Sequence, residues 1–123
     1  TRLEVVWRGK HPEREFAVGP QFWVRDGAVC LGERVLLEVP EGQWCRFAMS
    51  ARLGTPESGI GQAGLAEHGH WRLAVTVPGQ PTRVFEVLPF VDTAFRDLGT
   101  VMFISLATER TVCHLDSVRI TCE

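Results

Sequence analysis

Trp23 and Trp44 are the aromatic side chains of this sequence best placed to contact a ligand. Trp23 alternates in phase with Arg25 along a β-rich run, and Trp44 alternates in phase with Arg46. Because successive side chains of a strand point to opposite faces, each indole is expected on the same face as a guanidinium group. An outward indole offers a flat apolar surface, and the guanidinium beside it donates hydrogen bonds. The alternative is that each indole packs under a loop or against a neighbouring domain.

Three arginines extend this candidate binding surface. Arg46 and Arg52 lie in the outward phase of the run that contains Trp44. Arg72 lies in the outward phase of a later run, whose other phase begins with Trp71 and continues with aliphatic residues. We therefore expect Trp71 in the core, and we expect Arg46, Arg52 and Arg72 to donate hydrogen bonds beside an exposed indole.

Residues for catalysis form no recognisable constellation. The sequence contains no Gly-x-Ser-x-Gly motif and no cysteine in an activated context. Hydrolysis of a glycosidic bond needs two carboxyl groups facing each other across a cleft, and strand alternation singles out no pair among the 15 acidic residues. The sequence therefore predicts a protein without catalytic activity of its own.

Metal-binding motifs are weak. His68 and His70 form a His-x-His pair that one strand face would present to a metal ion, but two solvated imidazoles at a strand entrance explain the same pattern. The cysteines are too widely spaced for a Cys-x-x-Cys site, which argues against zinc. Each lies in an apolar, strand-like context, so we predict free thiols, with a disulfide left open for an extracellular protein. The four are Cys30, Cys45, Cys113 and Cys122.

Composition limits the class of protein. A chain of 123 residues, 45% hydrophobic and 23% charged, suits one domain spanning 1–123 with a sizeable core. A net charge of −2 argues against nucleic acid as a partner. No apolar run reaches the roughly 18 residues that would span a bilayer, so we expect no membrane partner. The first residue is Thr1, and the start has no signal-peptide core, so we expect a piece excised from a larger protein.

Short β-rich runs, separated by Gly- and Pro-containing turns, predict an all-β antiparallel sandwich of two sheets. Asp26-Gly27 is a typical two-residue hairpin turn, and Leu31-Gly32-Glu33 is expected to reverse the chain again. The stretch Thr55–Glu67, rich in Gly, is expected to form a loop. Strands are expected near 3–7, 21–25, 28–31, 34–39, 44–53, 70–77, 83–88, 100–107 and 111–121.

The C-terminal part is the clearest β signal. Two apolar arms of the stretch Val101–Ile120 flank the polar turn 108–111, which predicts a hairpin. The first arm is apolar in both phases apart from Ser105, a pattern typical of a central strand that is covered on both faces.

A resemblance to a known family rests on three stretches, PEGQWCRFAMSARLG, GHWRLAVTVPGQPTRVFEVLPF and FRDLGTVMFISLATERTVCHLDSVRI. They resemble the concanavalin/laminin-G-like jelly-roll sandwiches and the carbohydrate-binding modules of bacterial glycoside hydrolases. The shared elements are Gly-x-Trp at 42–44 and 69–71, Pro78-Gly79, and a closing strand at 115–120. The resemblance implies a two-sheet jelly-roll that serves as an accessory module of a secreted bacterial protein, in an extracellular or periplasmic location.

The resemblance also implies a function and a metal site. The function is glycan binding through Trp23 or Trp44, with a glycan or an adjacent catalytic domain as partner. The alternatives are a structural module that packs against a catalytic domain without binding sugar, and a fragment of a sugar-hydrolase sandwich. No cofactor is expected apart from a structural calcium ion on Asp116, with Glu4 or Glu123 as a second acid. The competing interpretation is that Asp116 caps a turn.

Overall fold

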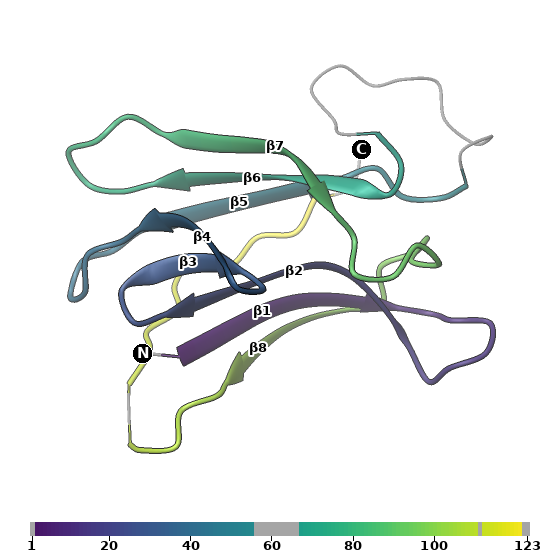
Figure 1. The fold of residues 1–123 in the computed structure, drawn as a ribbon, viewed down its shortest axis with the longest axis horizontal. Coiled ribbons are helices and arrows are strands. Elements are labelled where there is room, and N and C mark those ends of the chain that lie inside the picture. Colours follow the sequence, from purple (N-terminus) through teal and green to yellow (C-terminus); the bar gives the residue numbers. More distant parts are fainter. Residues whose placement is uncertain (1, 56–66, 111, 122–123) are drawn as a thin grey trace.

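A computed structural model of the chain describes residues 2–55, 67–110 and 112–121, which form eight strands and no helix (Figure 1). The predicted strands are confirmed in place, with shifted ends, over residues 2 to 107. No helix in the described residues is long and apolar enough to cross a membrane. The strands are β1 (Arg2–Gly9), β2 (Ala17–Arg25), β3 (Ala28–Leu31), β4 (Arg34–Glu38), β5 (Arg46–Ala51), β6 (His70–Thr76), β7 (Arg83–Pro89) and β8 (Thr100–Ser105).

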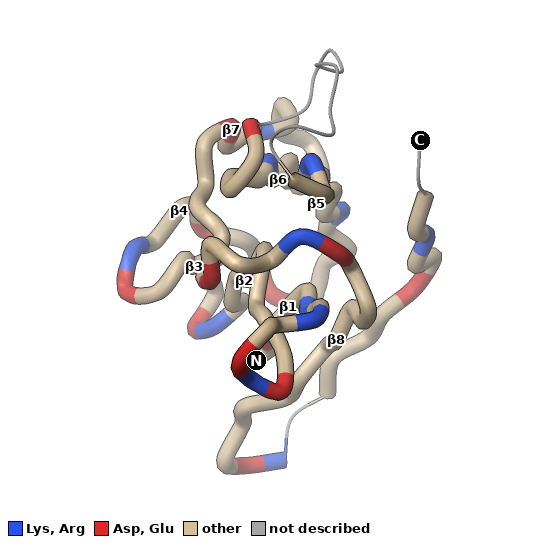
Figure 2. The backbone as a smooth tube through the Cα atoms, turned by 90° about the vertical axis from the view of Figure 1, so that its right-hand side faces the viewer, with Lys and Arg blue, Asp and Glu red and all other residues tan. Residues whose placement is uncertain are grey.

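The strands form two antiparallel sheets. One sheet has five strands in the order β4-β3-β2-β1-β8, and the other has three in the order β5-β6-β7. Seen along the strands, the three-stranded sheet lies over the five-stranded one (Figure 2). The prediction of an all-β protein with two antiparallel sheets is confirmed. The strand order does not by itself show a jelly-roll topology.

Hairpin turns fold the sheets as their residue types require. Asp26 and Gly27 have φ of 52° and 74°, so both central turn residues adopt the left-handed conformation that a two-residue hairpin needs. Gly32 has φ of 61° in the next turn, where Leu31 pairs with Arg34. Both predicted turns are confirmed, and they join β2, β3 and β4 into a continuous antiparallel ribbon.

Aromatic side chains join the two sheets. Trp71 on β6 is fully buried, and its ring lies 6.2 Å from that of Phe22 on β2. Its Nε1 donates a hydrogen bond of 3.2 Å to the carbonyl oxygen of Pro89, so burial leaves no unpaired indole N–H. The predicted row of inward residues along β6 is confirmed, because every second side chain from Trp71 is buried. That row comprises Trp71, Leu73, Val75 and Val77.

The predicted C-terminal hairpin is wrong. Residues 112–121 have no strand assignment, and their side chains are exposed. Ser117, with φ of 55°, interrupts the extended backbone of this segment. Val, Leu and Ile favour a strand only where a neighbouring strand completes the ladder, and none of the described residues does so here. The sequence pattern therefore indicated β-forming residues correctly but not their pairing.

The predicted central position of residues 101–106 is also wrong. β8 pairs with β1 and forms one edge of the five-stranded sheet. Phe103 on this strand is 39% exposed. The apolar pattern of β8 thus marks a sheet edge rather than a covered interior.

A loop is also predicted at Thr55–Glu67. Residues 56–66 of this stretch lie outside the described residues.

Trp71→Ala should destabilise the fold strongly, because it removes a fully buried aromatic ring that contacts both sheets. We expect urea denaturation to show a loss of about 3–5 kcal/mol in the free energy of unfolding. Trp44→Ala is the matched control, since Trp44 is 63% exposed, and it should change this free energy by less than about 1 kcal/mol. Equal losses for the two variants would contradict this assignment of core and surface.

Candidate functional site

The two candidate indoles belong to different sheets. Trp23 lies on β2 of the five-stranded sheet, whereas Trp44 lies two residues before β5 of the three-stranded sheet. Phe22, the neighbour of Trp23, points inward and stacks on Phe47 with ring centroids 5.4 Å apart. By alternation Trp23 faces outward from its own sheet, so the two tryptophans cannot form one platform.

Trp23 is the poorer platform of the two. It pairs in register with Cys30 on one side and Glu4 on the other, and it is half-buried. The Arg25 guanidinium carbon lies 5.7 Å from the ring centroid of Trp23. The outward phase predicted for Trp23 and Arg25 agrees with this arrangement, but the sheet leaves only part of the indole accessible.

Trp44 is much more accessible, and its surroundings follow from the alternation of β5. Phe47 and Met49 pack against the core, whereas Arg46 and Ala48 are exposed. The predicted phases of this strand are therefore confirmed. The strand itself begins at Arg46 rather than at Trp44, so Trp44 lies on the segment that leads into the sheet.

The outer face of the three-stranded sheet carries Arg46 at one end of β5 and Arg52 and Arg72 toward the other end. Ser50 on β5 pairs with Arg72 on β6, so both side chains occupy the face opposite the core. Arg72 Nη2 lies 3.9 Å from Glu86 Oε1 on β7, and the three strands thus contribute polar groups side by side. Arg46 lies at the other end of β5, and Arg52 follows its last residue. This surface, defined by Trp44, Arg46, Ser50, Arg52, Arg72 and Glu86, is called the outer polar face below.

A contact that the sequence did not reveal lies beside Trp44. The imidazole of His114 approaches the indole with ring centroids 6.4 Å apart and an interplanar angle of 61°, which is an edge-to-face arrangement. The two residues lie far apart in the chain, so no local pattern predicted their contact. The C-terminal segment therefore borders the candidate ligand-binding residue.

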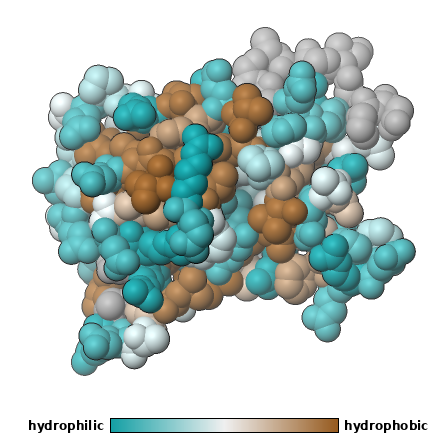
Figure 3. Space-filling view, in the orientation of Figure 1, coloured by the Kyte–Doolittle hydropathy of each residue, from teal (hydrophilic) through white to brown (hydrophobic). Residues whose placement is uncertain are grey.

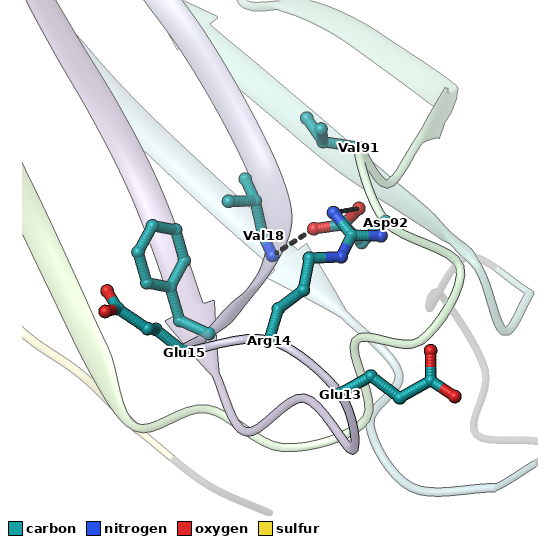
Figure 4. Close-up of a pocket in the computed structure, with 7 residues that line it drawn as sticks. Glu13, Arg14, Glu15, Val18, Val91 and Asp92 are labelled. Carbon is teal, nitrogen blue, oxygen red and sulfur yellow. Dashed lines mark hydrogen bonds and ion pairs between the residues drawn. The ribbon is translucent and has the colours of Figure 1, made fainter.

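A second candidate site is an open depression at one end of the sandwich (Figure 4). Its polar centre is Asp92, whose Oδ2 accepts a 2.8 Å hydrogen bond from the backbone N–H of Val18. Oδ1 of the same carboxylate lies 3.3 Å from Arg14 Nη1. The backbone N–H of Asp92 donates in return to the carbonyl oxygen of Val18 at 2.7 Å. The depression is lined by Glu13, Arg14, Glu15, Phe16, Val18, Val91 and Asp92.

Through these contacts Asp92 joins β2 to the segment that follows β7, and this junction is called the Asp92 clasp below. Gly19 is part of the same junction, because a Cβ atom at this position would lie 2.5 Å from the ring of Phe95. The carboxylate is thus occupied by structural partners. No sequence signal singled out Asp92, since its partners lie more than 70 positions earlier in the chain.

The predicted metal ligands are not brought together. Asp116 lies on an exposed segment that pairs with no described strand, so its predicted position on a final strand is wrong. Glu4 is hydrogen-bonded by the side chain of Gln21, and Glu123 lies outside the described residues. His68 lies in the turn that leads into β6, and His70 is the first residue of that strand. The described part of the chain contains no cluster of three or more His, Cys, Asp or Glu side chains able to hold a metal ion.

The described cysteines are free thiols in three different environments. Cys30 on β3 is buried, and Cys113 on the C-terminal segment is exposed. Cys45, next to Trp44, is partly buried, and this desolvation raises the pKa of its thiol above the ordinary value. Because the thiolate is the nucleophile, Cys45 is less reactive than an ordinary thiol at neutral pH. Cys122 lies outside the described residues.

No model of a protein family, no curated protein and no solved structure matches this chain. The class that the fold defines is therefore an all-β protein with two antiparallel sheets of five and three strands.

Asp92→Ala should destabilise the protein by about 1–3 kcal/mol, because it leaves the part-buried N–H of Val18 without its acceptor. Arg14→Ala removes only the ion pair, whose guanidinium is largely exposed, and should cost at most about 1 kcal/mol. Urea denaturation of the two variants separates the hydrogen bond from the ion pair. A larger loss for Arg14→Ala would contradict the clasp.

Iodoacetamide should alkylate exposed thiols before buried ones. The reaction is followed in a Cys122→Ser variant by mass spectrometry of tryptic peptides. Cys113 and Cys45 should both react before Cys30, which should react only on unfolding. The raised pKa of Cys45 means that its reaction should accelerate as pH rises beyond the range in which an ordinary thiol ionises. Labelling of Cys30 before Cys113 would contradict the assigned burial.

Proposed function

We propose that this protein is a noncatalytic carbohydrate-binding module, with a jelly-roll fold of the concanavalin/laminin-G type, that binds glycans at its outer polar face. Trp44 carries the proposal, because its indole is 63% exposed at the border of a sheet face furnished with arginines. A pyranose ring presents an apolar C–H face and a polar rim, and an exposed indole beside hydrogen-bonding groups complements both.

The polar side chains of this face would orient the bound sugar. Arg46 is exposed on the strand that follows Trp44, and Arg72 is held between β5 and β7 by its pairing with Ser50 and its ion pair with Glu86. Guanidinium donors and a carboxylate acceptor match the hydroxyl groups of a sugar, which both donate and accept. The flat shape of a sheet face favours an extended glycan chain over a small buried ligand.

The proposed setting follows from the sequence resemblance. The module would act outside the cytoplasm, as an accessory to the catalytic domain of a larger bacterial protein. It would bring that domain close to its substrate without reacting with the substrate itself.

A structural module that packs against a neighbouring domain is the second candidate. It is supported by apolar side chains that gather over the part of the surface where β4 lies (Figure 3). Val35 on β4 is 59% exposed, and Val84 and Val87 are exposed on β7 of the other sheet. Exposed apolar surface of this kind is typical of contacts between proteins or domains.

Trp44→Ala should weaken glycan binding roughly tenfold while leaving the melting temperature unchanged, because it removes the stacking surface and no core contact. Binding is screened on a glycan array and quantified by isothermal titration calorimetry with the oligosaccharide that binds best. Trp23→Ala is the matched control and should retain the affinity, since Trp23 lies on the other sheet.

Two outcomes would contradict this proposal. If the wild-type protein binds no glycan on the array, the structural module becomes the better account. If Trp23→Ala loses affinity and Trp44→Ala does not, binding takes place on the five-stranded sheet and the outer polar face is not the site.

A further inference from the structure

The C-terminal segment Val112–Thr121 is a β-forming sequence without a partner strand. Its backbone enters no ladder with the described strands, and its large apolar side chains are more than half exposed. A run of exposed apolar residues in water is unfavourable, because burial of each such side chain would stabilise the fold. These residues are Val112, Leu115, Val118 and Ile120.

The left-handed backbone of Ser117 is expected to bring the apolar side chains of this segment to one face. In an uninterrupted strand, Leu115 would point to one side and Val118 and Ile120 to the other. A single left-handed residue inserted into an extended run shifts the alternation by one position, as in a β-bulge. Ser117 has φ of 55°, so Leu115, Val118 and Ile120 are expected on the same side of the segment.

The sandwich has an open side that this segment borders. Among the described strands, β5 pairs only with β6, and β8 pairs only with β1, so each presents one unpaired edge. In Figure 2 the segment ending at the C-terminus runs along the side where these two edges lie. The ring contact between His114 and Trp44 places the start of the segment next to the residues that lead into β5.

An apolar surface is exposed at this open side. Phe103 on β8 pairs with Val5 on β1, and Val5 belongs to the core cluster, so Phe103 shares the core-facing side of its sheet. It is nevertheless 39% exposed, because the three-stranded sheet ends at β5 and does not extend over it. The open side thus offers an unpaired strand edge and an uncovered aromatic ring.

We propose that residues 112–121 act as a strap that closes over this open side, pairing with the free edge of β5 and covering Phe103 with Leu115, Val118 and Ile120. The occupant is the segment of the same chain. A connection of only residues 106–111 joins it to β8, and so short a tether gives a high effective concentration at its own sandwich. Closure removes an exposed strand edge of the kind through which sheet proteins aggregate.

Hydrogen exchange followed by mass spectrometry tests closure on the wild-type protein. We expect the amides of residues 113–121 and those of β5 to be protected relative to an unstructured peptide. Exchange of the segment at the rate of an unstructured peptide would overturn the proposal. The protein is kept at low micromolar concentration, and its mass is checked by light scattering. A dimer that disappears on truncation after Arg110 would also overturn it, because the segment would then be exchanged between copies.

Val118→Asp and Val35→Asp form a matched pair, since the two valines are 60% and 59% exposed. If the segment remained open, each substitution would change the melting temperature by a degree or two. Closure buries Val118 but not Val35, so Val118→Asp should lower the melting temperature by roughly 10 °C and Val35→Asp should not. Equal and small shifts for both variants would overturn the proposal. None of these readouts depends on the binding of a glycan.

Discussion

The packing of Phe22 between the two sheets is the interaction on which the rest of the structure depends. Its ring lies 5.4 Å from Phe47 and 6.2 Å from Trp71, so one side chain of β2 contacts both β5 and β6. Stacked sheets are separated by about 10 Å, a gap that large aromatic rings fill without leaving a cavity. This contact determines which faces of the strands point inward, and the outward faces are then determined by alternation.

The outer polar face is a direct consequence of that packing. Because Phe47 and Trp71 point inward, their neighbours Arg46 and Arg72 must point outward, where Arg46 is exposed and Arg72 is partly exposed. Trp44 lies outside the core because it precedes β5 and takes no part in the pairing of β5 with β6. The three-stranded sheet therefore has Trp71 in the core and Trp44 at the surface. Trp71 contributes to stability, whereas Trp44 is the residue proposed to bind glycans.

The unequal widths of the sheets leave part of the five-stranded sheet uncovered. Five strands cannot be fully covered by three, and the uncovered strands include β8 with its exposed Phe103. In the described part of the chain, this incomplete sandwich has free strand edges and apolar surface on one side, where the C-terminal segment runs. Closure by this strap would shield both, and it would do so next to Trp44, so that the edge of the sheet and the proposed binding residue share one border.

The sequence by itself determined the class of fold, most strands and the orientation of their side chains, because the alternation of apolar and polar residues and the left-handed turn at Asp26-Gly27 are local properties. It identified Trp71 as core and Trp44 as surface for the same reason. Only the tertiary structure decided which strands pair, that β8 is an edge among the described strands and that Val112–Thr121 enters no ladder with them. The Asp92 clasp and the contact of His114 with Trp44 also arise only there. Such contacts join residues far apart in the chain, and their energies depend on a geometry that no local pattern encodes.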